Sequence, residues 1–125
     1  MKPIMSSYRL FIDDERFPPR DGNIWHIARD WEDVMIAFRI HGMPSFISFD
    51  HDLGEDKHTG HDIAKFLVDL DMNAEEGNTD FTLPDDFDFY VHSQNPIGKA
   101  NIEGILRNYL RFKADNAWHH QDVLL

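Results

Sequence analysis

A chain of 125 residues, 42% hydrophobic and 13% aromatic, can enclose one core, so we expect a single domain over residues 1–125. The net charge of −11 repels polyanions and disfavours binding to duplex DNA, and the lack of cysteine excludes disulfides and zinc–thiolate sites. No apolar run approaches the roughly 20 residues of a membrane span, and no signal peptide opens the chain, so we expect a soluble, cytoplasmic protein.

The N-terminal third of the chain predicts two strands and one helix. The nearly continuous apolar run 8–12 is typical of a strand covered on both faces, and the run 24–28 predicts a second strand. The segment 14–23 between them holds two prolines, a glycine and five charges, which predicts a loop. A capping residue at Asp30, with an acid three residues later, predicts a helix that ends near His41, before a glycine.

The middle of the chain predicts a strand, a helix and a long loop. Residues 46–49 form the third apolar run, which again ends in an acid. Thr59 and Asp62 form a pattern similar to a capping box, and an apolar stripe then recurs at helical spacing as far as Leu70. Residues 72–86 are acidic, rich in turn formers and without periodicity, so we expect a mobile loop there.

The C-terminal part predicts a fourth strand and a last helix. Residues 87–92 form the strand, and Asn95 with Pro96 is a strong signal for a helix start. An apolar face runs to Leu110, whereas the tail 115–125 can either dock or fray. Strands that alternate with helices favour a parallel sheet in a layered α/β domain.

Polar residues follow three of the four predicted strands. They are Asp13 and Asp14 after the first, Asp50, His51 and Asp52 after the third, and His92, Ser93, Gln94 and Asn95 after the fourth. Ligands gather at the carboxyl ends of parallel strands, so these side chains are expected to converge. Carboxylates held so closely repel unless a cation or shared protons intervene, and Mg²⁺ or a similar divalent cation prefers oxygen ligands. We therefore predict that Asp13, Asp14 and Asp50 bind metal, with Asp52 a fourth ligand or an orienter of His51.

The imidazoles of His51 and His92 are candidates for acid–base catalysis. Each neighbours an acid or a hydroxyl at a strand end and can lie within hydrogen-bond reach of a substrate. The alternative is that either ring simply bonds a loop carbonyl.

A phosphate site is predicted where the last helix begins. Free N–H groups and the helix dipole favour an anion there, with Ser93, Asn95 and Lys99 as its ligands. Ser93 can alternatively act as a nucleophile, although a neighbouring strand residue is poorly placed to activate it. Arg16 can clamp phosphate or neutralise the adjacent acids Asp14 and Glu15.

Three strings spread over residues 8–103 carry a family resemblance: LFIDDER-x-P, FDHDLG followed by TGHD, and VHSQNPIGKANI. They resemble the cyclic-phosphate processing receiver-like family, a divergent branch of response-regulator receiver domains. The resemblance implies a reduced, flavodoxin-like, doubly wound α/β sandwich of about four parallel strands with helices on both faces, which binds Mg²⁺. It matches Asp13 and Asp14 to the paired acids, Asp50 to the phosphoacceptor and Ser93 to the hydroxyl position. It also implies functional roles for five residues of the branch's motifs: His51, Asp52, His92, Asn95 and Asn101.

The resemblance further implies a Mg²⁺-dependent hydrolase of the cyclic phosphodiesterase type. Its partner would be a small phosphorylated ligand, either a nucleotide or an RNA end, with no duplex DNA or membrane involved. Two alternatives stay open: a signalling receiver phosphorylated on Asp50, and a non-catalytic module that binds a nucleotide or a protein. Two departures from ordinary receivers disfavour phosphorelay. The loop 14–23 replaces a helix, and no fifth strand ends in a lysine unless Lys99 takes that role.

Overall fold

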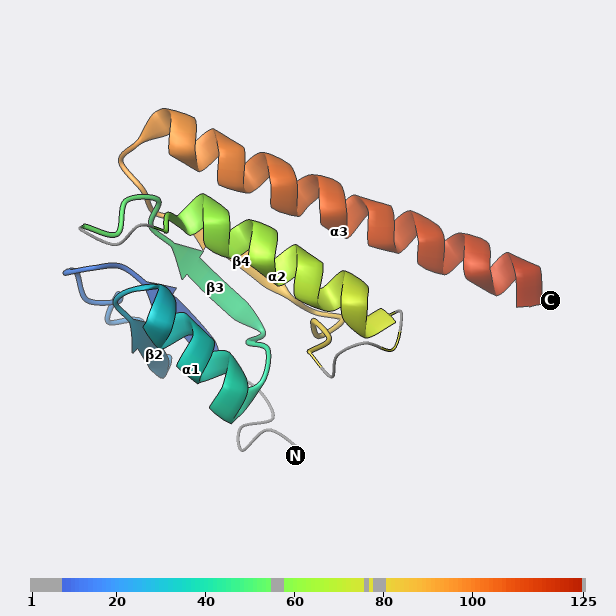
Figure 1. Cartoon of the computed structure of the whole chain (residues 1–125), viewed down its shortest axis with the longest axis horizontal. Coiled ribbons are helices and arrows are strands. Elements are labelled where there is room, and N and C mark those ends of the chain that lie inside the picture. The colour runs from blue at the N-terminus through green and yellow to red at the C-terminus, as the bar shows by residue number, and fades with distance from the viewer. Residues whose placement is uncertain (1–7, 55–57, 76, 78–80, 125) are drawn as a thin grey trace.

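Four parallel strands form one sheet in the order β2-β1-β3-β4 (Figure 1). The computed structural model describes residues 8–54, 58–75, 77 and 81–124, and for residues 75 and 117–124 the backbone alone. The elements are β1 (Arg9–Ile12), β2 (Trp25–Ala28), α1 (Trp31–His41), β3 (Phe46–Phe49), α2 (Gly60–Glu75), β4 (Asp88–Val91) and α3 (Pro96–Leu124). The predicted α/β class and the four parallel strands are confirmed, and residues 14–23 contain no helix.

The strands are in register, so their carboxyl ends are level. Ile12 of β1 pairs with Ala28 of β2 on one side and with Phe49 of β3 on the other, and Phe49 pairs with Val91 of β4. Residues that directly follow these four therefore emerge at the same edge of the sheet.

All three helices begin at the residues that the sequence predicts. Asp30 caps α1 by accepting a hydrogen bond from the Asp33 N–H at 2.8 Å. Thr59 and Asp62 cap α2 reciprocally, because each side chain accepts from the other residue's N–H, at 3.2 and 2.9 Å. Asn95 caps α3 by accepting from the Gly98 N–H at 2.9 Å.

Two helices extend further than predicted. α2 continues to Glu75, so the loop expected from Met72 begins later. α3 continues to Leu124, so the tail from residue 115, which was expected either to dock or to fray, has a helical backbone as far as Leu124. A buried carboxylate explains the longer α2, since Asp71 in its last turns bonds to Tyr109 and Lys113 of α3.

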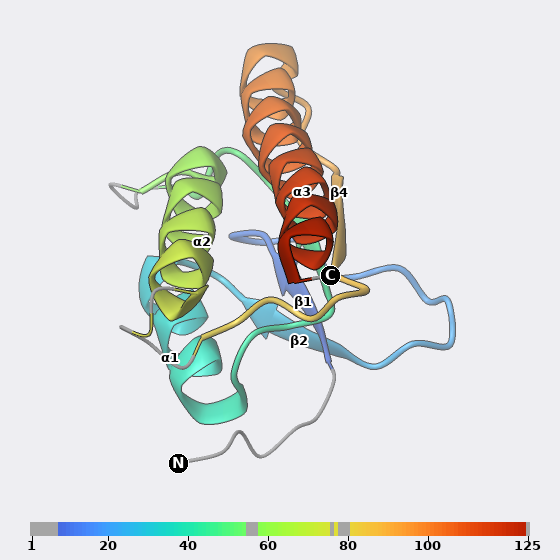
Figure 2. The same ribbon diagram turned by 90° about the vertical axis from the view of Figure 1, so that its right-hand side faces the viewer.

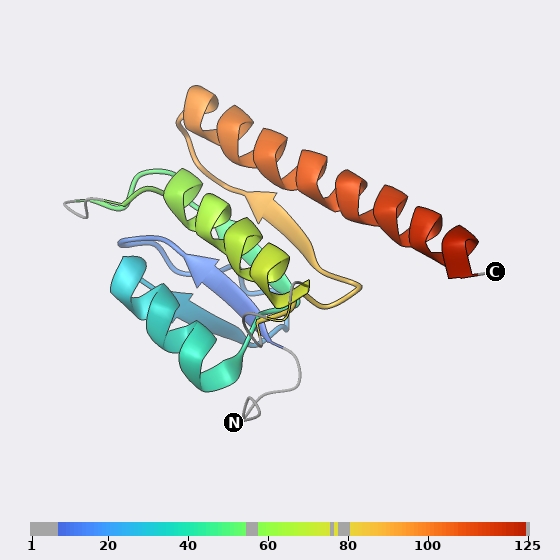
Figure 3. The ribbon, with the colours of Figure 1, turned by 45° about the vertical axis from the view of Figure 1, so that its right-hand side comes forward.

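One core fills the space between the sheet and the helices. It joins side chains of all four strands and all three helices, among them Leu10, Ile12, Ala28, Val34, Phe38, Ile47, Phe49, Ile63, Leu67, Val91, Ile102 and Leu106. In Figure 3, α1 and α2 stand in front of the sheet, and α3 packs along α2 beside β4. The helices therefore share one core and one face of the sheet.

The resemblance implied helices on both faces of the sheet, whereas the helices that the structure describes share one face. In Figure 2, α1 and α2 lie on one side of the strands and the segment between β1 and β2 lies on the other. The crossovers β2–α1–β3 and β3–α2–β4 proceed in the same direction across the sheet, and right-handed crossovers then place their helices on the same face. The connection that reverses direction, β1 to β2, contains no helix.

Aromatic side chains cover part of the opposite face. Phe11 is 4% exposed although it lies outside the helix-side core, and it packs edge-on against Trp25 with ring centroids 6.0 Å apart. Trp25 in turn contacts Phe46, and the Arg9 guanidinium lies over both rings. This aromatic layer shields β1 from solvent on the face without helices. Within the described ranges, no helix combines the length and apolarity needed to cross a membrane.

Candidate functional site

Three polar residues leave the sheet at its carboxyl edge, each held by one further ladder hydrogen bond. The N–H of Asp13 donates to a β2 carbonyl at 3.1 Å, and those of Asp50 and His92 donate to β1 and β3 carbonyls, each at 2.9 Å. Because β1, β3 and β4 end at paired residues, the three side chains emerge on one face. One ligand atom from each lies within 4.8 Å of the others. The structure thus brings these three strand ends together.

Asp13 is fully buried, and its carboxylate accepts three hydrogen bonds and forms one ion pair. Its Oδ1 accepts from the N–H groups of Glu15 at 3.0 Å and Arg16 at 2.8 Å. Its Oδ2 accepts from His92 Nε2 at 2.9 Å and forms an ion pair with Arg16 Nε, also at 2.9 Å. Burial alone would raise the pKa of Asp13, but these hydrogen bonds and the Arg16 charge outweigh it and hold the pKa below its usual value. Asp13 is therefore ionised at neutral pH.

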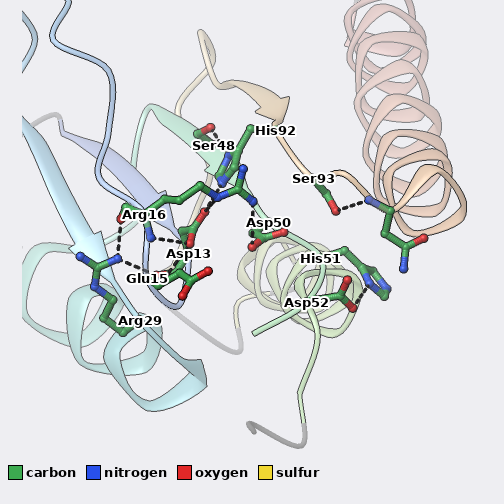
Figure 4. A network of polar contacts seen from close by, with 11 residues as sticks. Asp13, Glu15, Arg16, Arg29, Ser48, Asp50, His51, Asp52, His92 and Ser93 are labelled. Carbon is green, nitrogen blue, oxygen red and sulfur yellow. Dashed lines mark hydrogen bonds and ion pairs between the residues drawn. The ribbon is translucent and has the colours of Figure 1, made fainter. Parts of the chain in front are cut away.

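Arg16 bridges the two buried carboxylates. Besides its contact with Asp13, its Nη2 reaches Oδ2 of Asp50 at 3.4 Å, so one guanidinium lies between residues from the ends of β1 and β3 (Figure 4). Asp50 is 5% exposed, whereas the Arg16 side chain is 44% exposed. The sequence left open whether Arg16 clamps a phosphate or neutralises Asp14 and Glu15. In the structure its guanidinium lies on Asp13 and Asp50, and the phosphate-binding role stays a prediction.

His92 is fixed on three sides. Its Nε2 bonds Asp13, its Nδ1 lies 2.7 Å from Ser48 Oγ, and its ring stacks on Phe11 with centroids 4.7 Å apart and planes 4° apart. A carboxylate can only accept, so Nε2 carries the proton, and the Ser48 hydroxyl donates to Nδ1 whenever the ring is neutral. Both ring nitrogens are therefore engaged by the protein, which makes His92 a rigid support for Asp13 in this arrangement.

A cavity of about 630 Å³ opens beside this network. It is lined by Asp14, Glu15, Arg16, Asp50, Asp52, Gly54, Gln94 and Asn95. The lining joins the loops after β1, β3 and β4, and among the residues that the structure describes Arg16 is its one basic member. The predicted ligand Asp14 is exposed and lines the cavity, although it does not belong to the cluster of Asp13, Asp50 and His92.

His51 and Asp52 form a second pair next to the first network. His51 Nδ1 lies 3.1 Å from Asp52 Oδ1, and Figure 4 shows this pair on the α3 side of Asp50. The ring packs on Gly98 so closely that a Cβ there would lie 2.3 Å from His51 Cγ. A close approach also fixes the loop itself, since a Cβ at Gly60 would lie 2.0 Å from the Asp50 carbonyl oxygen. These two contacts explain the glycines of the TGHD and NPIGK strings.

The residues predicted to hold phosphate are only partly gathered at the cavity. Asn95 lines it while capping α3, and Ser93 Oγ accepts from the Asn95 N–H at 3.1 Å. Lys99 is directed elsewhere, with Nζ over the Tyr90 ring at 5.9 Å, and Asn101 is exposed on α3. The roles of Ser93, Lys99 and Asn101 stay predictions, and none of these three residues belongs to the cavity lining.

Two supporting residues were not predicted. Arg29, directly after β2, donates from Nη1 to the carbonyl oxygens of Asp13, at 3.1 Å, and of Arg16, and thereby holds the loop that carries both. Ser48 orients His92 from two positions before Asp50. The rule used for the other strands would have found Arg29, because it too follows a strand end, and strand alternation would have placed Ser48 on the face of Asp50.

The strand order equals that of the first four strands of the flavodoxin-like fold, and the acids after β1 and β3 lie at its carboxyl edge. The molecule is thus a receiver-like α/β domain. A family model described as the cyclic-phosphate processing receiver domain matches residues 8–108, and the chain belongs to this family. This match confirms the family resemblance of the three sequence strings. No curated protein and no solved structure matches the chain.

Proposed function

We propose that the chain is a divalent-cation-dependent phosphoester-processing domain that hydrolyses or opens a cyclic phosphate on a nucleotide or RNA end. The observation that carries this proposal is the pair of buried carboxylates, Asp13 and Asp50. Both contact the guanidinium of Arg16, beside a cavity of about 630 Å³. A cavity of this size falls within the roughly 300–1,000 Å³ typical of small-ligand sites. Family membership supports the class of substrate.

The donor set fits Mg²⁺ or a similar ion. Mg²⁺ usually takes one or two carboxylates and keeps several waters, and the guanidinium between Asp13 and Asp50 shows that this pair already accommodates a positive charge. Asp13 and Asp50 would hold the ion, with Asp14 acting through water. When bound, Mg²⁺ supplies Lewis-acid polarisation of a phosphoryl oxygen or a water activated for attack.

The side chains around the cavity suit a phosphoester. The Arg16 guanidinium can bind phosphate oxygens with its planar fork, and the amides of Gln94 and Asn95 add hydrogen-bonding groups to the lining. Between the two imidazoles, His51 is the better proton carrier. Asp52 accepts from its Nδ1–H and so orients the ring with a basic Nε2, whereas both nitrogens of His92 are held by Asp13 and Ser48.

A purified-protein assay with 2′,3′-cyclic AMP tests this proposal. We expect the wild type to release the phosphomonoester only in the presence of Mg²⁺ or Mn²⁺. Replacing Asp50 with Asn should lower turnover by about 100-fold or more, as loss of one electrostatic contact to a reacting group does elsewhere. Product is followed by chromatography.

Asp69→Asn is the matched control, since it removes an exposed carboxylate of α2 outside the site and should retain full turnover. Absence of turnover by the wild type with either metal, or full turnover by Asp50→Asn, would refute the hydrolase. Tight binding of intact cyclic nucleotide without product would favour the binding module. A conformational change or dimerisation with beryllofluoride would instead favour the signalling receiver.

A further inference from the structure

We infer that Arg16 is a displaceable counter-cation of the Asp13–Asp50 pair, so that a divalent cation can enter only by expelling its guanidinium. The inference rests on the proposed function for the presence of a divalent cation at these two residues. It adds a role for Arg16: the chain carries its own competitor for the metal.

The guanidinium of Arg16 occupies the position that a metal ion bound to both carboxylates would need. Nε bonds Asp13 Oδ2 at 2.9 Å, and Nη2 lies 3.4 Å from Asp50 Oδ2. These oxygens belong to the residues of the cluster whose ligand atoms lie within 4.8 Å of one another. A cation held by both carboxylates therefore needs the space and the oxygen lone pairs that the guanidinium now uses.

The guanidinium is weakly held on the Asp50 side. Each carboxylate receives a single nitrogen of the guanidinium, rather than the paired contact that makes arginine–carboxylate bridges strong, and the distance to Asp50 is long for a charged hydrogen bond. The side chain is also 44% exposed, so it can move out into the adjoining cavity that it lines.

The carboxylates stay in place when the guanidinium leaves. Asp13 keeps three donors: the N–H groups of Glu15 and Arg16, and His92 Nε2. The Asp50 backbone is fixed by its N–H bond to a β1 carbonyl and by the close packing of Gly60 on its own carbonyl. Asp50 is nevertheless buried, and among the described residues Arg16 is its one cationic contact. A buried carboxylate with such a long contact favours a replacement cation.

Mn²⁺ titration by calorimetry provides the first test. Arg16→Gln keeps the backbone N–H bond to Asp13 and removes the competing charge, so it should bind Mn²⁺ about tenfold more tightly than the wild type, within the usual range of coupling between sites. Arg107→Gln, which removes an exposed charge from α3, should keep the wild-type affinity and so controls for net charge. Equal or weaker binding by Arg16→Gln overturns the inference.

A second test needs no variant. In the ¹⁵N NMR spectrum of the wild type, the Nε–H signal of Arg16 should move towards that of free arginine as Mg²⁺ saturates the protein, since the bond to Asp13 is lost. A signal that is unchanged at saturation overturns the inference.

The two proposals fail separately. Tighter Mn²⁺ binding by Arg16→Gln without any turnover of cyclic nucleotide would support the counter-cation and refute the hydrolase. Metal-dependent turnover with equal Mn²⁺ affinities would refute the counter-cation alone.

Discussion

Replacing Asp13 with Ala should lower the free energy of unfolding by about 3–5 kcal/mol, because it leaves three part-buried donors without their acceptor, at about 1–3 kcal/mol each. The substitution removes the acceptor of three hydrogen bonds, from Glu15, Arg16 and His92, and the ion pair with the Arg16 side chain, at a position without solvent exposure. Urea unfolding followed by circular dichroism measures the change. Asp14→Ala is the matched control, because this neighbouring acid is exposed and should cost about 0.5 kcal/mol or less.

The loss of stability in Asp13→Ala should depend on pH. The folded protein lowers the pKa of Asp13, so the stabilisation by its carboxylate is fully present above the ordinary aspartate pKa of about 3.9 and is lost as the pH falls through the lower, folded value. The difference between the wild type and Asp13→Ala should therefore narrow below about pH 4. A difference near zero at neutral pH, or one that is constant into the acid range, would show that the carboxylate is not held as described.

Replacing Asp71 with Ala should lower stability by a similar amount, about 3–5 kcal/mol, but should leave the metal site intact. Asp71 is fully buried at the opposite edge of the sheet, where its carboxylate accepts from the Leu83 N–H at 2.8 Å, from Lys113 Nζ at 2.7 Å and from the Tyr109 hydroxyl. It therefore ties α2, α3 and the segment before β4 together. Its loss would leave a partly buried ammonium and a phenol without this carboxylate.

Urea unfolding and Mn²⁺ titration of the same preparation separate the two effects for Asp71→Ala. We expect lower stability and wild-type Mn²⁺ affinity, in contrast to Asp13→Ala, which should lose both. The control is Asp69→Ala, two residues away on the exposed side of α2. Wild-type stability for Asp71→Ala would mean that the network around Asp71 contributes nothing to the free energy of unfolding. Weakened Mn²⁺ binding would mean that this network is coupled to the metal site at the carboxyl ends of the strands.

Features that depend on neighbouring residues could be predicted from the sequence. The caps Asp30, Thr59 and Asn95 act within four residues of themselves, so local pattern suffices to find them. The meeting of Asp13 and Asp50 followed from one further rule, that parallel strands of alternating α/β sequences end at a common edge.

Features that depend on distant partners could not be predicted. In the sequence, nothing distinguishes Asp71 from the acids that follow it. Only the folded structure shows its contacts with Tyr109 and Lys113, which lie about 40 residues further along the chain. The bridge of Arg16 to Asp50 depends on a side-chain rotamer in the folded site rather than on spacing. The placement of the helices on one face of the sheet depends on the strand order. In this order the crossovers from β2 to β3 and from β3 to β4 proceed in the same direction across the sheet.

Anomalous diffraction from crystals grown with Mn²⁺ tests the central claim most directly, that residues from the ends of β1 and β3 share one exchangeable cation. The account predicts a single strong peak bonded to both Asp13 and Asp50, with the Arg16 guanidinium turned away into the cavity. A peak elsewhere on the acidic surface, or none while Arg16 still bridges the two carboxylates, would contradict it.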